Sequence, residues 1–386
     1  MSAFLGPIHY WLYHKIKIQE ELTQKVLSHL KSESYLSINQ QIKDHFDCLP
    51  VGDLEEVIDN QHIHEWLQSK VTLVEQRYAF AISEILNKAY LTVEEIEAIA
   101  YKVGKKWAPF DLVNVQSAYR FLNDHLLDGM PCDRINQVVN ETSYCITFKR
   151  QKCIHKSYWE KYGQSGELYY KLREAFVQGL LTYSPVTYKA TDGGEQCLEV
   201  SGISLLKSEH QIILEAADIL RALCLEIIEQ KPIPFDALRD IVDFVQNYAD
   251  AHHHAKEEKY LFEVMETDLG KIGSNLIRHG MLVEHDLGRL HIKELAEALD
   301  SVCVDEQSRR LDLVGHGVAY VHLIKRHIEK EDALIFAYGE KHLAVERLNE
   351  VNQQTLIFEA SSEQVAVREN YCRLIKKLQE NRSVSF

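Results

Sequence analysis

Two stretches of the chain carry the same pattern: His253-His254-Ala255-Lys256-Glu257, followed by Leu261-Phe262, and His327-Ile328-Glu329-Lys330-Glu331, followed by Ile335-Phe336. Both read His-x-x-x-Glu, and in both an aliphatic residue and a phenylalanine come eight and nine positions after the histidine. Residues four apart lie on one face of an α-helix, with Cβ atoms about 5–6 Å apart. The histidine and the glutamate of each motif can therefore reach one metal ion, or a metal ion and its bridging ligand.

A further histidine precedes each motif at almost the same distance. His210 lies 43 residues before His253, and His285 lies 42 residues before His327. Helical patterns cover these residues, at about 203–230, 235–266, 270–300 and 306–339. Four long helices with short connections favour an up-down-up-down antiparallel bundle, in which residues equidistant from a turn face each other. The spacing thus predicts four imidazoles and two carboxylates converging inside one bundle.

The expected cluster offers nitrogen and carboxylate oxygen but no thiolate, a donor set that suits iron, manganese or zinc. Each of two metal ions could take two histidines, and the two glutamates could bridge the ions. The first motif leaves a second pairing open, because His254 and Glu258 are also four residues apart. Alignment of the two motifs on Leu261-Phe262 favours His253 with Glu257.

With these features, the region from Ser201 to His342 resembles the hemerythrin-like, HHE cation-binding domains. The resemblance implies a non-haem di-iron centre, for which manganese or zinc could substitute. It implies six ligands, of which the two glutamates bridge the irons: His210, His253, Glu257, His285, His327 and Glu331.

Oxygen-carrying hemerythrins use two histidines one turn apart on the third helix, whereas here Met281 and Arg289 lie four residues from His285. The chain is therefore similar to the six-ligand branch of the family, which includes proteins that repair iron centres after nitrosative stress. That repair group carries a short cysteine-bearing N-terminal segment, and the sequence shows no such segment here.

An iron pair with six protein ligands keeps positions open for O₂, NO, peroxide or water. We expect a protein that binds or senses O₂, NO or a redox signal. The same site would serve a di-iron enzyme or iron donor in nitric-oxide or peroxide detoxification, or in repair of iron centres. Iron storage is a third alternative, and the motif does not separate a sensor from an enzyme.

The composition excludes other classes of function. The net charge is −15 and no basic run offsets it, which argues against nucleic-acid binding. The sequence shows neither a signal peptide nor 18 consecutive apolar residues, so we expect no membrane span. Eight cysteines without a CxxC pair suggest reduced thiols in a cytoplasmic protein. The spacing of Cys145, Cys153, His155 and Cys197 fits no zinc pattern.

The predicted fold is mainly α, in three parts. All four tryptophans lie within the first 160 residues, whereas 11 of the 19 histidines lie between His210 and His342. We therefore expect a mostly helical domain at 1–200, the bundle at 201–342 and a helical tail at 343–386, with the boundary near 191–194 or at Ser201. The N-terminal half would provide a homodimer or partner contact.

Within the N-terminal half, periodicity predicts helices and a small β element. Thr92 and Glu95 form an expected capping box. A strand is expected at 142–149, and a hairpin at 186–190 and 196–200. The expected helices are 7–31, 53–69, 71–89, 92–104, 110–127 and 166–182.

Overall fold

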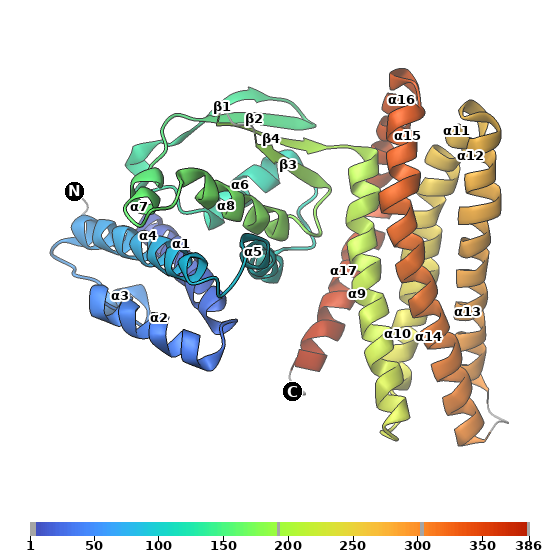
Figure 1. Cartoon of the computed structure of the whole chain (residues 1–386). Coiled ribbons are helices and arrows are strands. Elements are labelled where there is room, and N and C mark those ends of the chain that lie inside the picture. Colours follow the sequence, from blue (N-terminus) through green and yellow to red (C-terminus); the bar gives the residue numbers. More distant parts are fainter. Residues whose placement is uncertain (1–4, 191–193, 302–304, 384–386) are drawn as a thin grey trace. The chain divides into compact units, whose positions relative to one another are not determined.

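The computed structural model describes residues 5–190, 194–301 and 305–383. The chain divides into two compact units, Met1–Val200 and Ser201–Phe386. Helices dominate both units, and the first unit also contains a four-stranded sheet (Figure 1). The predicted fold class is thus confirmed. Among the described helices, none combines the length and the apolar character that crossing a membrane requires.

The helices of the first unit are α1 (Pro7–Ser28), α2 (Ser32–His45), α3 (Leu54–Val57), α4 (Ile63–Asn87), α5 (Val93–Trp107), α6 (Val115–His125), the 3₁₀ turn η1 (Pro131–Asp133), α7 (Lys156–Glu160) and α8 (Gly166–Leu180). The expected break near residue 70 is wrong, because buried Leu67, Val71 and Val74 continue one helical face through it. The capping box that begins α5 is confirmed: Thr92 and Glu95 each accept a hydrogen bond from the other's backbone N–H.

The sheet of the first unit is antiparallel, with strand order β1-β2-β4-β3. Its strands are β1 (Asn136–Glu141), β2 (Cys145–Arg150), β3 (Val186–Ala190) and β4 (Glu195–Val200). The expected strand at 142–149 corresponds to β2, and β3 and β4 pair as the expected hairpin. Residues 191–193, which include Gly193 of the expected Gly-Gly turn, lie outside the described residues. Helices α6 and α8 contact the sheet.

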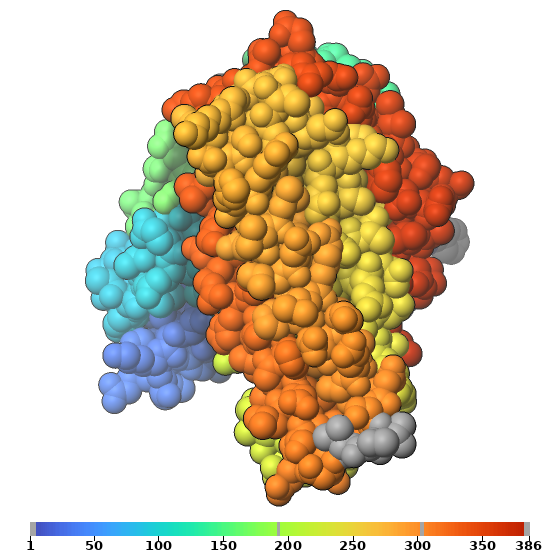
Figure 2. Space-filling model, turned by 90° about the vertical axis from the view of Figure 1, so that its right-hand side faces the viewer, coloured from blue at the N-terminus to red at the C-terminus, as the bar shows by residue number. Residues whose placement is uncertain are grey.

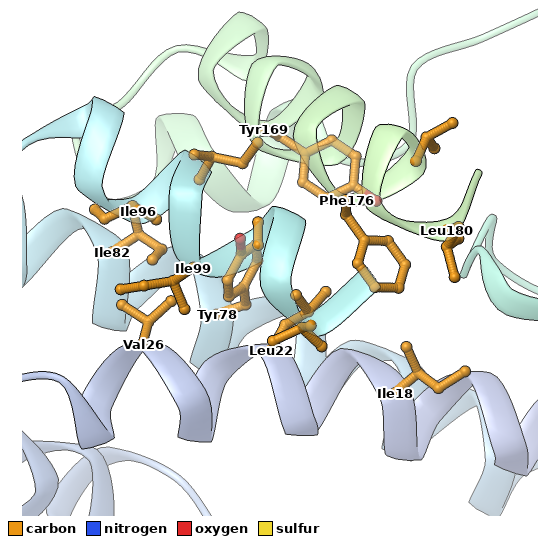
Figure 3. Packing of buried hydrophobic residues seen from close by; sticks show 14 of the residues in the cluster. Ile18, Leu22, Val26, Tyr78, Ile82, Ile96, Ile99, Tyr169, Phe176 and Leu180 are labelled. Carbon is orange, nitrogen blue, oxygen red and sulfur yellow. The ribbon is translucent and has the colours of Figure 1, made fainter. Parts of the chain in front are cut away.

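The core of the first unit forms where α1, α4, α5 and α8 meet. Figure 3 shows Leu22 and Val26 of α1 pointing toward Tyr78 of α4, with Phe176 of α8 on the other side. Helices α5 and α8 approach closely at two glycines. A Cβ atom on Gly179 would lie 2.1 Å from the carbonyl oxygen of Tyr101, so the crossing excludes any side chain there.

A buried ionic network ties α4 to α8 in the same unit. Arg173 donates two hydrogen bonds to Asp128, at 2.6 and 2.7 Å. His155 is fully buried and donates through Nδ1 to Glu75 at 3.0 Å, and its Nε2 lies 3.6 Å from Asp128. Burial by itself would lower the pKa of His155, but the two carboxylates outweigh it and raise this pKa.

The second unit begins with four long helical rods, each close to an expected helix. The first rod is α9 (Gly202–Ile228). The other three contain wider π-helical segments within α-helix: α10 (Phe235–Phe244), η2 (Val245–His254), η3 (Glu257–Phe262) and α11 (Glu263–Asp268); then α12 (Gly270–Leu276), η4 (Ile277–Met281) and α13 (Leu282–Asp300); then α14 (Glu306–Lys330), η5 (Glu331–Ile335) and α15 (Phe336–His342).

The four rods run side by side (Figure 1), and α14 contacts both α9 and α13. Three of the four π-helical segments, η2, η3 and η5, overlap the two His-x-x-x-Glu motifs. Such segments are rare and occur frequently at functional sites. Figure 2 shows the face of the unit that is formed largely by the second and third rods.

The expected helical tail consists of α16 (Val345–Glu359) and α17 (Ser362–Ser383), which pack against α9 and η2. Val351, Thr355 and Ile375 are buried in this contact. The Asn352 side chain accepts hydrogen bonds from the backbone N–H groups of Gly202, at 2.9 Å, and Ile203, at 3.3 Å. The tail thus satisfies backbone donors at the start of α9, which otherwise lack a partner within the helix.

Candidate metal centre

The six side chains expected as ligands meet inside the bundle. They come from all four rods, and each is at most 2% exposed: His210 of α9, His253 of η2, Glu257 of η3, His285 of α13, His327 of α14 and Glu331 of η5. The alternative glutamate of the first motif, Glu258, lies outside this cluster and is partly exposed.

The Glu257 carboxylate lies between imidazoles of both halves of the bundle. Its Oε1 is 3.5 Å from Nε2 of His210 and 3.4 Å from Nε2 of His253. Its Oε2 is 3.7 Å from Nε2 of His285. The two oxygens of the Glu257 carboxylate are thus directed to different parts of the cluster.

The Glu331 carboxylate is placed in the same way. Its Oε2 lies 3.1 Å from Nε2 of His327 and 3.3 Å from Nε2 of His210, and its Oε1 lies 3.7 Å from Nε2 of His285. Two donors about 2.1 Å from one metal ion are roughly 3–4 Å apart. These separations match such donor pairs.

The hydrogen bonding of the cluster is incomplete. Within the described residues, none of the four carboxylate oxygens of Glu257 and Glu331 makes a hydrogen bond, nor does Nε2 of His210. Buried polar atoms without partners are costly and rare in native proteins. A pair of metal ions would satisfy these atoms, so the residues present fit a two-metal centre.

Each of the four imidazoles is held from behind by a carboxylate at Nδ1. Because an ionised carboxylate only accepts, Nδ1 carries the proton and Nε2 faces the cluster. Carboxylates in this position orient the imidazoles of metal sites and strengthen them as ligands. The pairs are His210 with Asp332 at 2.9 Å, His253 with Glu209 at 2.8 Å, His285 with Glu258 at 2.7 Å and His327 with Glu284 at 3.0 Å.

These supporting contacts repeat between the two halves of the bundle. Glu209 and Glu284 each precede a histidine of the cluster and support the histidine of the motif that follows. Lys256 forms an ion pair with Glu209, and Lys330 with Glu284. The phenylalanine of each motif stacks on the histidine of the opposite half: Phe336 on His210, with ring centroids 5.5 Å apart, and Phe262 on His285, at 5.9 Å.

The charges of the metal-free centre follow from these contacts. Burial alone would lower the pKa of His285, but the hydrogen bond with Glu258 and the nearby Glu331 carboxylate outweigh it and raise the pKa to about 9. Burial favours a higher pKa for Glu331, yet the surrounding histidines hold it well below its usual range. Protons therefore occupy part of the centre without metal, and metal binding must displace them.

His254 is a further imidazole at the centre, which the sequence suggested only as an alternative to His253. It is 7% exposed, and its ring stacks on that of His285 with centroids 3.8 Å apart. One of its nitrogens lies within 4.8 Å of ring nitrogens of both His285 and His327. Burial and the neighbouring His285 lower the pKa of His254 to about 3.

A second polar cluster lies behind His253, where Glu209 meets His252 and Glu359. This cluster already contains a cation. The Nζ atom of buried Lys256 donates to both carboxylates and lies 2.9 Å from Nε2 of His252. The ammonium group neutralises these carboxylates and links the tail to the support of His253.

In the first unit, the structure brings together only part of the sequence cluster of cysteines and histidine. The thiols of Cys145 and Cys197, on neighbouring strands, are 3.3 Å apart and lie near Glu199. His155 instead belongs to the buried network with Glu75. Structural zinc sites use four ligands from a suitable set, which the described residues do not assemble at this place.

The supporting roles of Glu258 and Asp332 were not identified from the sequence, where Glu258 was considered only as an alternative ligand, although a signal was available. Each follows the glutamate of a motif directly, and each supports the histidine of the opposite half. The repeat of the two motifs therefore extends one residue further than the ligand pattern.

Comparison with known proteins agrees with this geometry. Residues 201–338 match the model of the hemerythrin HHE cation-binding domain, whereas the N-terminal half matches no family model. No curated protein and no solved structure gives a significant match to the chain. The matched segment contains all six clustered side chains. Residues 201–338 of this chain are therefore similar to the hemerythrin HHE cation-binding domain.

Proposed function

We propose that the C-terminal unit holds two iron ions and uses them to bind or sense O₂ or NO. The proposed ligands are His210 and His253 for one ion, His285 and His327 for the other, and Glu257 and Glu331 as bridges. The observation that carries the proposal is the placement of the two carboxylates, whose oxygens are directed to imidazoles of both halves without a hydrogen-bond partner in the described residues.

The chain's own residues determine what this centre can do. The four supporting carboxylates fix each imidazole with Nε2 inward, and the phenylalanines of the motifs stack on His210 and His285. An iron pair with this donor set supplies redox chemistry and open positions for a small ligand. Such a site is shared by proteins that bind or sense a small ligand and by enzymes that turn it over. We favour binding or sensing for this chain.

The test is metal analysis and reactivity of the full-length protein after anaerobic purification. We expect two irons per chain and, on stopped-flow mixing of the reduced protein with NO, one spectral change that saturates at a fixed ratio of NO to protein. Continued consumption of NO with product release would instead show an enzyme. Two zinc ions in a colourless protein, or fewer than two metals, would overturn the proposal.

We further propose that the N-terminal unit relays the state of the centre, by docking a partner or a second copy. The support is the division of the chain into two compact units, of which only the second contains the metal cluster within the described residues. Hydrogen exchange of the iron-loaded protein, reduced and oxidised, should differ in peptides from 5–190. Identical exchange, together with a monomer that captures no partner, would contradict the relay.

A further inference from the structure

The two halves of the bundle differ at three positions close to the centre, although their ligands and supports repeat. Asp250 of the second rod contacts both His254, on its own rod, and Arg289 of the third rod. Counted from the equivalent histidines, the same positions on the fourth and first rods hold only aliphatic residues: Ile328, Ile324 and Leu214. The repeat is therefore broken by a polar group that only one metal position can use.

Within this group, His254 has the arrangement of the four proposed imidazole ligands. Its Nδ1 lies 3.3 Å from Oδ1 of Asp250, as each of the other four imidazoles has Nδ1 against a carboxylate. The proton on Nδ1 leaves Nε2 with a free lone pair. His254 is buried, and one of its nitrogens lies within 4.8 Å of those of His285 and His327.

Arg289 explains how this arrangement is held. Its guanidinium donates to Asp250 at 2.8 Å and to Glu258 at 2.8 Å. These two carboxylates support His254 and His285 respectively. Arg289 lies one helical turn after His285 on the third rod and, through Asp250, fixes an imidazole of the second rod.

We propose that His254 is a fifth imidazole ligand, which serves only the metal held by His285 and His327. The proposal rests on the two-metal centre and deepens it, because the two ions then differ in their donors: three imidazoles for one and two for the other. The His254 ring lies nearly parallel to that of His285, at 13°. Coordination of a shared metal therefore requires the His254 ring to turn out of this stack.

The test uses the substitution that the other half of the bundle already contains. In His254→Ile the imidazole is replaced by the side chain found at the equivalent Ile328, which is 3% exposed and fits a buried helix position. We expect His254→Ile to weaken one of the two Fe²⁺ binding steps by about 10- to 100-fold or more, while the other step stays unchanged. Anaerobic titration against a competing chelator measures both steps.

Mössbauer spectroscopy of the ⁵⁷Fe-loaded protein gives an independent readout. Wild type should show two quadrupole doublets of equal area, and in His254→Ile the parameters of the two doublets should become more alike. His254→Gly should lose the same binding step and recover it with added imidazole, which can enter the vacated space. Ile328→Leu is the matched control and should leave both steps and both doublets as in wild type. Circular dichroism of the metal-free variants checks the fold.

The outcomes separate this inference from the proposed function. If wild type binds two irons and both His254 variants bind them with unchanged affinities and spectra, His254 is not a ligand, and the six-ligand centre stands. If both binding steps weaken equally in His254→Ile, the residue acts on the whole bundle and the assignment to one metal is wrong. If wild type does not bind two irons, the proposed function fails and the fifth ligand fails with it.

Discussion

Replacing both bridging carboxylates, in Glu257→Leu combined with Glu331→Leu, should abolish metal binding without unfolding the bundle. A structural four-ligand zinc site is worth about 10–16 kcal/mol, hence roughly 3 kcal/mol per ligand. Each metal position here faces oxygens of both carboxylates. The double variant therefore removes two donors from each position, or about 6 kcal/mol, which is about four orders of magnitude in affinity.

The same substitution should not destabilise the metal-free protein. Both carboxylates are fully buried, and within the described chain their oxygens have no hydrogen bond to lose. Replacement of a whole buried ion pair by apolar residues is often neutral or stabilising by about 1–4 kcal/mol, and the same should hold here because the imidazoles that remain can lose their protons, since burial lowers their pKa once the carboxylates are gone. We therefore expect a melting temperature of the metal-free variant equal to or above that of the metal-free wild type.

Metal content after anaerobic reconstitution with Fe²⁺, together with circular dichroism at 222 nm, measures both effects. The matched control is Glu263→Ala combined with Glu329→Ala, which removes two exposed glutamates close to the same motifs. The control should bind two irons. Two irons in a folded Leu variant would show that Glu257 and Glu331 are not the bridges, and loss of helix in that variant would refute the argument on stability.

Further predictions concern the N-terminal unit, which tryptophan fluorescence can follow alone because all four tryptophans lie in its first 160 residues. Asp128→Ala leaves Arg173 buried without its partner and should cost about 3–5 kcal/mol in urea unfolding; Asp133→Ala, which removes a more exposed carboxylate, should cost under about 1 kcal/mol. The pKa of His155 in the folded state is raised above the unfolded value near 6.5. Its contribution to the free energy of unfolding should therefore be complete below about pH 6.5 and decline as the pH rises through the folded-state pKa. His155→Gln should flatten this decline. Gly179→Ala forces a Cβ atom against the facing backbone and should cost at least about 1–3 kcal/mol, whereas a rise in stability would contradict the close crossing.

The sequence predicted the helices of the bundle well because their ligands recur at fixed spacing. The doubled motif and the two preceding histidines identify four rods and the level at which they face each other. Elements with few buried residues gave no comparable signal. Helix α2 buries only Ile38 and Ile42, and β1 has no buried residue, so neither was predicted.

The role suggested for His254 could not be predicted from α-helical periodicity. In an α-helix, His253 and His254 point in different directions, so only one of them was expected at the centre. The structure places both histidines in the π-helical segment η2, whose hydrogen bonds span five residues rather than four. This wider helix changes the direction of successive side chains, and the change depends on packing rather than on local sequence.

The tail helices have a practical consequence for work on the bundle. The matched family segment ends at residue 338, whereas Asn352 and Glu359 of α16 hold the start of α9 and the buried ammonium of Lys256. A fragment cut at the limits of the family match would expose the surfaces of α9 and η2 that α16 and α17 cover, and it would leave this ammonium without one of its two carboxylates. A fragment that folds by itself should therefore retain α16 and α17, because the segment that matches the family model and the folding unit end at different residues.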